Sequence, residues 1–142
     1  MRALFDVNAL IALLDPGHVH HHRTHRWWAN NRRAGWATCP LTQNGFVRVL
    51  SQPGYANSIS AAVATEFLAG ALDTPQHEFW PDGLSITDAE TFVRERILGP
   101  RQITDLYLLA LAVRRQGRLV TFDKSIPLSV VVGATARNLV VV

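Results

Sequence analysis

Short apolar runs alternate along the chain with longer segments in which apolar residues recur at helical spacing. The short runs predict strands at 2–5, 36–38, 77–80, 119–122 and 139–142. The longer segments predict helices at 9–14, 20–31, 40–50, 58–72, 87–98 and 106–115. The strands are mostly short apolar runs and do not alternate, which is typical of parallel strands buried on both faces. The pattern therefore predicts an α/β sandwich, with a short, mainly parallel sheet between two layers of helices.

Local signals set the predicted ends of several helices. A turn at 15–17, Asp-Pro-Gly, ends the first helix, and Pro40 fits an early position of the third. The segment Thr87-Asp88-Ala89-Glu90 matches a capping box, so we expect a helix from there to about Leu98. Thr104 or Asp105 is the expected cap of the last helix.

Length and composition favour one folded domain over residues 1–142. The chain has 48% hydrophobic and 18% charged residues, which excludes a disordered chain. Its one cysteine, Cys39, excludes an internal disulfide and a cysteine-only zinc site. No apolar run reaches the roughly 18 residues of a membrane span, so no membrane partner is expected. The first segment contains Arg2 and Asp6 and makes a poor signal peptide, so we expect a cytoplasmic protein.

The balance of charge permits binding to nucleic acid without requiring it. The formal net charge is +3, and all 14 basic residues except Lys124 are arginine. Arginine holds phosphate with a planar fork that lysine lacks. Coding bias towards arginine explains the same composition, so charge alone does not decide the function.

Three aspartates lie at the ends of apolar elements. Asp6 and Asp123 each follow a predicted strand, and Asp105 opens an apolar helix. Ligands of open α/β sheets bind at the carboxyl ends of the strands. Carboxylates gathered there repel one another, and a hard divalent cation relieves that repulsion. Such a site suits phosphodiester hydrolysis, in which a bound metal activates water and stabilises the leaving oxygen.

Each aspartate also has a purely structural interpretation. Asp105 fits the N-cap of its helix, and Asp123 fits a turn after a strand. Asp6 is harder to explain in this way, because an acid between two apolar runs is costly unless it is paired. The three together favour the metal site.

Four segments, in this order along the chain, resemble the PIN-domain ribonucleases. The resemblance is greatest to the toxin half of the bacterial VapBC toxin–antitoxin systems. The four segments lie at 4–13, 41–49, 103–112 and 118–123. Each segment is weak alone, because an acid between apolar residues is common. Their order and separation make the resemblance specific.

The resemblance implies a PIN fold and an endoribonuclease that depends on Mg²⁺ or Mn²⁺ and cuts structured RNA such as tRNA or ribosomal RNA. It also implies inhibition by a cognate VapB antitoxin and a homodimer. The acidic metal-binding positions of the family match Asp6, Asp105 and Asp123. Polar neighbours that support them match Asn8, Thr104 and Thr121.

One position departs from the family pattern. Close relatives carry a glutamate directly after the threonine of the second segment, and Gln43 stands there in this chain. Glutamine keeps an oxygen ligand but has no charge and cannot act as a general base. We expect three aspartates to suffice, because Mg²⁺ usually takes only one or two carboxylates from protein. The alternative is a family member that binds RNA or antitoxin without cleaving.

Further residues suggest contacts with substrate. Arg48 follows Gln43 on the same predicted helix, and Lys124 follows Asp123, so both are candidates for holding an RNA phosphate. Lys124 beside Asp123 also allows a phosphate-accepting signalling module, a third and poorer hypothesis.

The histidine-rich segment 18–25 has two interpretations. Its pair His21 and His25 has the spacing of a zinc site, although zinc needs more ligands. A solvated helix face is the favoured reading, with RNA contacts through Arg23, Arg26, Arg32 and Arg33 as another. The alanine-rich helix 58–72 serves either core packing or a dimer or antitoxin groove.

Overall fold

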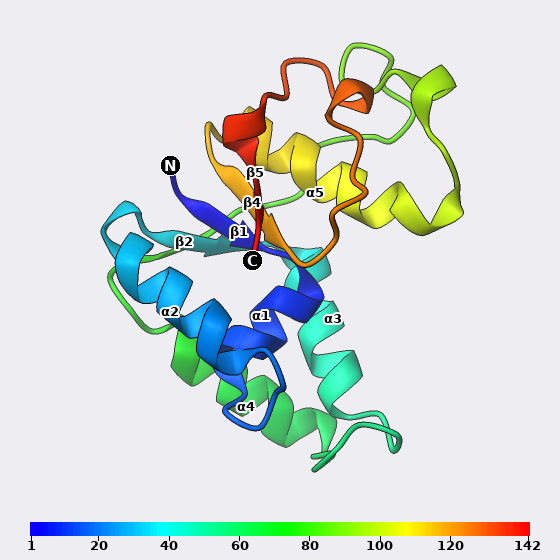
Figure 1. The fold of residues 1–142 in the computed structure, drawn as a ribbon. Helices are drawn as coiled ribbons and strands as arrows, with labels where there is room; N and C mark the ends of the chain where they lie inside the picture. Colours follow the sequence, from blue (N-terminus) through cyan, green and yellow to red (C-terminus); the bar gives the residue numbers. More distant parts are fainter.

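The computed structural model describes residues 1–142 and contains one sheet of five parallel strands, in the order β3-β2-β1-β4-β5 (Figure 1). The strands are β1 (Ala3–Phe5), β2 (Trp36–Thr38), β3 (His77–Phe79), β4 (Arg118–Thr121) and β5 (Leu139–Val141). Each neighbouring pair is parallel. The predicted parallel α/β sheet is therefore confirmed, with strand bounds within a residue of those expected.

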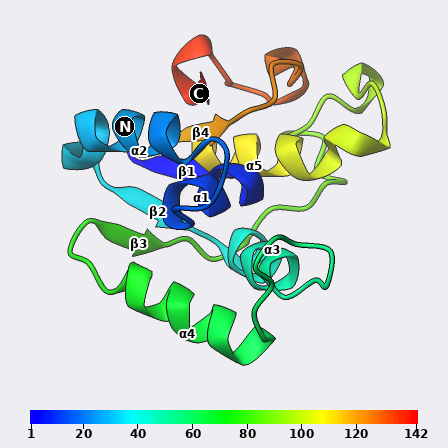
Figure 2. The same ribbon diagram turned by 60° about the horizontal axis from the view of Figure 1, so that its bottom comes forward.

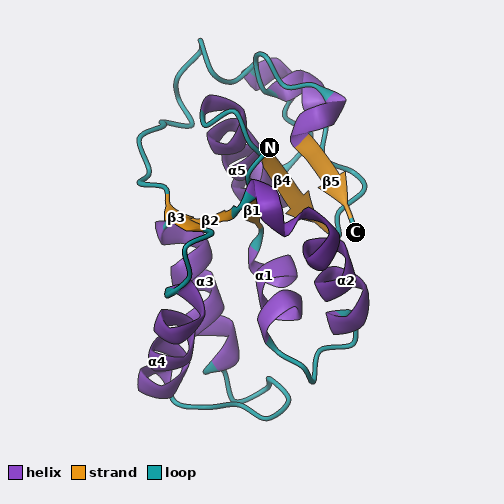
Figure 3. Ribbon diagram, turned by 90° about the vertical axis from the view of Figure 1, so that its left-hand side faces the viewer, coloured by secondary structure: helices purple, strands orange, loops and turns teal.

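Five helices cover the two faces of this sheet. They are α1 (Val7–Leu14), α2 (His21–Asn31), α3 (Pro40–Leu50), α4 (Ala61–Leu72) and α5 (Ile103–Arg114). Helix α5 lies on one side of the strands and the other four lie on the opposite side (Figure 3). Helices α3 and α4 pack side by side near β3 (Figure 2). No helix is both long enough and apolar enough to span a membrane.

Five short 3-10 helices complete the secondary structure. They are η1 (Arg32–Ala34), η2 (Arg94–Arg96), η3 (Pro100–Gln102), η4 (Leu128–Val130) and η5 (Ala136–Asn138). Helix η3 leads directly into α5, and η1 follows α2 directly.

Alternate residues of the central strands enter different cores. Ala3 and Phe5 of β1 pack with the helices α1 to α4, whereas Leu4 packs with α5. Trp27 and Trp28 of α2 both pack edge-on against Phe5, with centroids 5.9 and 6.2 Å away. Burial on both faces explains why central strands such as β1 read as continuous apolar runs.

A glycine brings α3 close to the start of α1. A Cβ atom added at Gly45 would lie 2.3 Å from Cγ2 of Val7. No side chain fits in that space, so Gly45 allows the two helices to touch beside Asp6. The start of α1 is thereby held against the middle of α3.

The predicted helix over 87–98 does not form. Asp88 instead closes a local turn, accepting hydrogen bonds from the Glu90 N–H at 3.0 Å and the Thr91 hydroxyl at 2.6 Å. Beyond it, Phe92 is buried and forms an antiparallel bridge with Val131. Pairing with a distant segment satisfies the backbone here, and only the single turn η2 remains helical.

Helix α5 begins earlier than predicted, and its expected caps are wrong. The N-cap is Gln102, so Thr104 and Asp105 both lie inside the first turn. The carboxylate of Asp105 is therefore not used to cap the helix. Helix α1 also begins early, at Val7, because Asp6 is its N-cap and accepts the Ala9 N–H at 2.7 Å.

Candidate functional site

Three elements bring the aspartates to the carboxyl edge of the sheet. Asp6 follows β1, and Asp123 lies two residues beyond β4, the neighbour of β1. Asp105 enters from the first turn of α5. The three carboxylates lie near enough for their charges to act on one another, since Asp6 and Asp123 both raise the pKa of Asp105.

Asp6 is the most buried of the three, with 7% of its surface exposed. Burial raises the pKa of its carboxyl, and the charge of Asp123 adds to this. The Thr121 hydroxyl and the Ala9 N–H oppose the rise because they stabilise the ionised form. The carboxylate thus combines a capping role with a place in the cluster.

Asp123 is held by a tight local turn. Its Oδ1 accepts the Ser125 N–H at 2.7 Å and the Ser125 hydroxyl at 2.6 Å. These bonds lower the pKa of Asp123. Its own N–H donates to the Thr121 hydroxyl at 3.0 Å, so buried Thr121 interacts with both strand-end aspartates.

Asp105 has the most strongly shifted carboxyl of the cluster. Burial, followed by the charges of Asp6 and Asp123, raises its pKa to about 6. The carboxyl has no hydrogen-bond partner that would offset this. A cation at the site would lower the pKa again by stabilising the ionised form.

The three aspartate side chains suit a hard cation, although they are not close enough for all three to bind one ion directly. The side chains supply carboxylate oxygens, which Mg²⁺ and Mn²⁺ prefer. No group of three histidine, cysteine, aspartate or glutamate side chains in the chain is close enough to hold one metal ion together. Mg²⁺ commonly takes one or two carboxylates and fills its other positions with water, so the residues fit such an ion without three direct ligands.

Gln43 lies in α3 and lines a different hollow from the aspartates. Its Nε2 donates to the Thr38 hydroxyl at 2.9 Å. A cavity of about 400 Å³ is lined by both Gln43 and the exposed Arg48, and none of the three aspartates lines it. Gln43 is therefore engaged with the end of β2.

The remaining predicted residues are exposed around this edge. Asn8 lies in the first turn of α1, and its backbone N–H contributes to stabilising the Asp6 carboxylate. Thr104 is exposed in the first turn of α5. Lys124 is exposed directly after Asp123 and forms no ion pair.

A second hollow beside Asp123 contains residues that the sequence did not single out. It has a volume of about 400 Å³ and is lined by 98–102 with Asp123 and Ser125. Gln102 donates from Nε2 to the Ser125 carbonyl at 3.3 Å, and its buried Oε1 has no partner. Segment 100–102 reads as a loop in the sequence, so no local signal marks Gln102.

The histidine pair of α2 lacks the further ligands of a zinc site. The rings of His21 and His25 are 5.4 Å apart, and no third ligand joins them. His21 instead uses Nδ1 for a 2.8 Å hydrogen bond with the Ala12 carbonyl.

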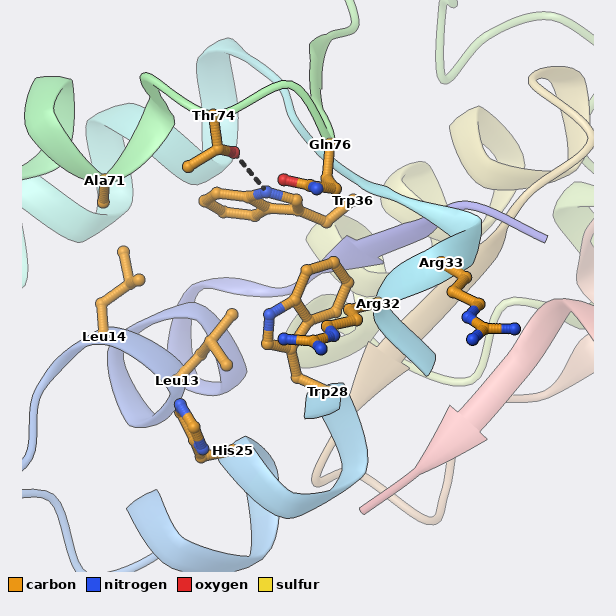
Figure 4. Close-up of a pocket in the computed structure, with 10 residues that line it drawn as sticks. All are labelled: Leu13, Leu14, His25, Trp28, Arg32, Arg33, Trp36, Ala71, Thr74 and Gln76. Atoms are coloured by element: carbon orange, nitrogen blue, oxygen red, sulfur yellow. Dashed lines mark hydrogen bonds between the residues drawn. The ribbon is translucent and has the colours of Figure 1, made fainter. Parts of the chain in front are cut away.

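The largest cavity of the molecule lies away from the aspartates (Figure 4). Its volume is about 740 Å³, and its walls come from α1, α2, η1, β2 and the end of α4. Trp28 and Trp36 form part of its wall, and the Trp36 indole N–H donates to Thr74 at 3.4 Å. None of the residues predicted for the aspartate site lines this cavity, whereas His25, Arg32 and Arg33 of the histidine- and arginine-rich segment do.

Comparison with known families identifies the class of this fold. The PIN domain model matches residues 3–128. The chain therefore belongs to the PIN-domain family, within the group that includes the VapC ribonucleases.

Two curated relatives illustrate the similarity. Ribonuclease VapC44 of Mycobacterium tuberculosis is 54% identical over 139 residues, covering 98% of each chain. Ribonuclease VapC39 of the same organism is 42% identical over 127 residues, covering 89% of this chain and 91% of the relative.

A solved structure shares the fold at low sequence identity. It is a chain of VapBC2 from Rickettsia felis, whose crystal structure was obtained with a DNA fragment from their promoter. The TM-score is 0.58 with 16% identity, covering 89% of this chain and 94% of that one. At this identity the likeness supports the fold alone.

Proposed function

We propose that this protein is an endoribonuclease that hydrolyses phosphodiester bonds of structured RNA, such as tRNA or ribosomal RNA, with Mg²⁺ or Mn²⁺. The observation that carries the proposal is the gathering of Asp6, Asp105 and Asp123 at the carboxyl edge of the sheet, where burial and then the neighbouring charges raise the pKa of Asp105 to about 6. The names of the relatives, ribonucleases VapC44 and VapC39, support the same activity.

The protein's own residues have distinct roles in this proposal. Asp6, Asp105 and Asp123 would hold the ion, one or two of them directly and the rest through its bound water. The Thr121 hydroxyl stabilises the Asp6 carboxylate and accepts the backbone N–H of Asp123. A bound divalent ion would supply an activated water and stabilise the leaving oxygen. Lys124, exposed directly after Asp123, and Arg48, exposed on α3 beyond Gln43, hold RNA phosphates. Asn8 and Thr104 support the carboxylates from the first turns of their helices.

Regulation and assembly follow the same family. We expect a cognate antitoxin of the VapB kind, a homodimer and a cytoplasmic location. Val63 and Phe67 on α4 are 50% and 43% exposed, which offers an apolar surface for such contacts. Light scattering of the purified chain measures its oligomeric state directly.

A second candidate function, RNA binding without cleavage, is favoured by Gln43. Its amide is committed to Thr38, and it supplies no negative charge to the site. The two candidates differ in one measurable property, the breaking of the phosphodiester bond.

The test is cleavage of a structured RNA pool with Mg²⁺, with Mn²⁺ and with EDTA. Asp6→Asn is the informative variant, because asparagine still caps α1 while the charge is lost. Asp73→Asn is the matched control, since Asp73 is exposed after α4 and outside the cluster. Cleavage that needs metal and Asp6, but tolerates the control change, supports the nuclease. Binding of RNA without cleavage under all conditions would favour the second candidate.

A further inference from the structure

An aromatic and cationic cluster surrounds Phe122, the residue directly before Asp123. The His18 ring stacks nearly parallel to the phenyl ring, with centroids 6.3 Å apart and planes at 10°. His20 approaches at 4.9 Å between centroids. The Arg23 guanidinium carbon lies 4.9 Å from the same ring centroid. The loop before α2 and its first turn thus meet the end of β4 beside the candidate site.

The ring of Phe122 is held in place by the core. Phe122 is half-buried and packs against the core on the α1 to α4 side of the sheet. A cation over a phenyl ring gains a modest attraction, so the ring positions Arg23 without covering its charge. Arg23 itself is exposed to solvent.

The cluster offers hydrogen-bond donors, and few acidic side chains of the chain itself are paired with them. His18 accepts the His20 N–H on Nδ1 at 3.0 Å, so the neutral ring carries its proton on Nε2. Asp15 is the one acid acting on His18, and no acidic residue lies between Asp15 and Glu66. Arg23 forms no ion pair, because the chain's single ion pair joins Arg2 to Glu78. An anion from outside the chain would satisfy these donors.

The exposed face of α2 carries further positive charge beyond the Phe122 cluster, away from Asp123. Arg23 and Arg26 lie three residues apart, on one side of the helix. Both are exposed, as are Arg32 and Arg33 of η1 beyond the helix. The inward face is different, since Thr24 is buried and Trp27 packs on Phe5. Arg23 and Arg26 therefore extend the positive charge from Phe122 along one side of α2 and form the strip, whereas Arg32 and Arg33 line the largest cavity with Trp28.

We propose that this strip, from the Phe122 cluster along the outer face of α2, binds the phosphate backbone of RNA that extends from the cleavage site. The inference rests on the proposed function, because it says where the protein holds the RNA strand that reaches the aspartate cluster. Exposed cations without paired acids suit a polyanion, and Arg holds phosphate with two parallel donors. The strip contacts backbone instead of bases, so it holds RNA of different sequences.

The experiment measures RNA affinity in EDTA, where binding is separated from metal-dependent cleavage. The probe is a labelled oligoribonucleotide of mixed sequence, about 12 nucleotides long. Arg23→Gln and Arg26→Gln are compared with Arg137→Gln, which removes the same charge from exposed η5. We expect each α2 change to weaken binding about fivefold and to reduce the salt slope by about 0.7. The Arg137 change is expected to alter neither quantity.

A second variant tests the ring independently of charge. Phe122→Leu keeps the position apolar but removes the surface that holds Arg23, His18 and His20. We expect about threefold weaker RNA binding, with an unchanged circular dichroism spectrum as the check on folding. Unchanged RNA affinity in Arg23→Gln or in Phe122→Leu overturns the proposal, as does an equal loss in Arg137→Gln.

The outcomes also separate this inference from the proposed function. RNA binding that depends on Arg23, without cleavage in any metal, supports the strip and removes the nuclease. Cleavage that depends on Asp6 but is indifferent to Arg23 removes the strip alone. A parallel measurement with poly-aspartate covers an acidic protein partner. Loss of poly-aspartate binding with unchanged RNA binding would assign the strip to such a partner and overturn the proposal.

Discussion

The two charged regions of this molecule differ in how they hold like charges together. At the carboxyl edge of the sheet, Asp6 and Asp105 are wholly or partly buried, and their carboxyl pKa values are raised. On α2, Arg23 and Arg26 gather positive charge on an exposed surface. Water screens the second group and not the first.

This difference separates a reactive site from a binding surface. Buried carboxylates gain most from a cation, because little solvent competes for their charge. Exposed guanidinium groups gain little from any single partner, and they act together on an extended polyanion. Removing a buried charge should therefore change chemistry, whereas removing an exposed one should change affinity.

The largest expected effect is a loss of cleavage rate when an aspartate is substituted, compared with a loss of RNA affinity when an arginine of α2 is substituted. Asp123→Asn keeps an oxygen that can accept from Ser125 but loses the charge. We expect the rate at saturating RNA to fall about 100-fold or more, while RNA affinity changes less than about twofold. Arg23→Gln should do the reverse and raise KM at unchanged kcat. Single-turnover kinetics of both variants measures the split, and equal loss of kcat in both would remove the distinction.

The next largest effect is stabilisation of the fold by Mg²⁺, because the ion binds the aspartate cluster and not the arginines of α2. A ligand that binds only the folded state adds about 1.4 kcal/mol at ten times its Kd. We therefore expect Mg²⁺ to raise the free energy of unfolding of the wild type and of Arg23→Gln. Asp123→Asn should lose most of that increase. Denaturant unfolding with Mg²⁺ or EDTA gives the comparison, and equal Mg²⁺ stabilisation of all three proteins would contradict it.

A smaller effect follows from the raised pKa of Asp105. Its pKa is about 6 in the folded protein against an ordinary value of 3.8. Above these values folding must place a charge where it is disfavoured, so the carboxylate weakens the fold at neutral pH. Without metal, we expect Asp105→Asn to add about 1 kcal/mol at neutral pH, after allowance for solvent screening.

This gain should shrink as the pH falls through about 6 and vanish below 3.8, where the carboxyl is protonated in both states. Denaturant unfolding in EDTA across this range measures it, with Asp73→Asn as the control. A gain that is constant with pH would show that burial and neighbouring charge do not disfavour the Asp105 carboxylate as expected.

The pattern of apolar residues correctly predicted the helices and strands that pack one whole face into the core. Segments 36–38 and 40–50 have the predicted bounds, because flanking residues such as Pro40 and Gly35 fix their ends. Segment 87–98 was mispredicted as a helix because Phe92 pairs with Val131, a contact distant in sequence. Local capping signals cannot compete with backbone pairing that only the folded chain provides.

The same distinction applies to the candidate site. The rule for parallel sheets brings Asp6 and Asp123 to one edge once the strands are recognised. The start of α5 also decides that Asp105 is not a cap, and this needed the structure. The unpartnered Oε1 of Gln102 and the packing of His18 on Phe122 had no sequence signal, because each depends on loops meeting across the fold.

The smallest expected effect concerns Gln43, where the resemblance to the VapC toxins leads us to expect glutamate. Gln43 donates to Thr38, whose hydroxyl lies 2.8 Å from Nε2 of His77. In Gln43→Glu the Thr38 hydroxyl would donate to the new carboxylate, and its oxygen would be free to accept from His77. Burial and Arg2 lower the pKa of His77, and this change should raise it.

Because three aspartates remain, we expect Gln43→Glu to change the cleavage rate by less than about tenfold. The pKa of His77, followed by NMR titration, reports the new hydrogen bond independently of activity. If cleavage were instead found only in the glutamate variant, the natural carboxylate site would be one charge short. In this chain, both the aspartate cluster and the arginines of α2 would then only bind RNA. The aspartate cluster would cleave RNA only after glutamate restores the missing charge.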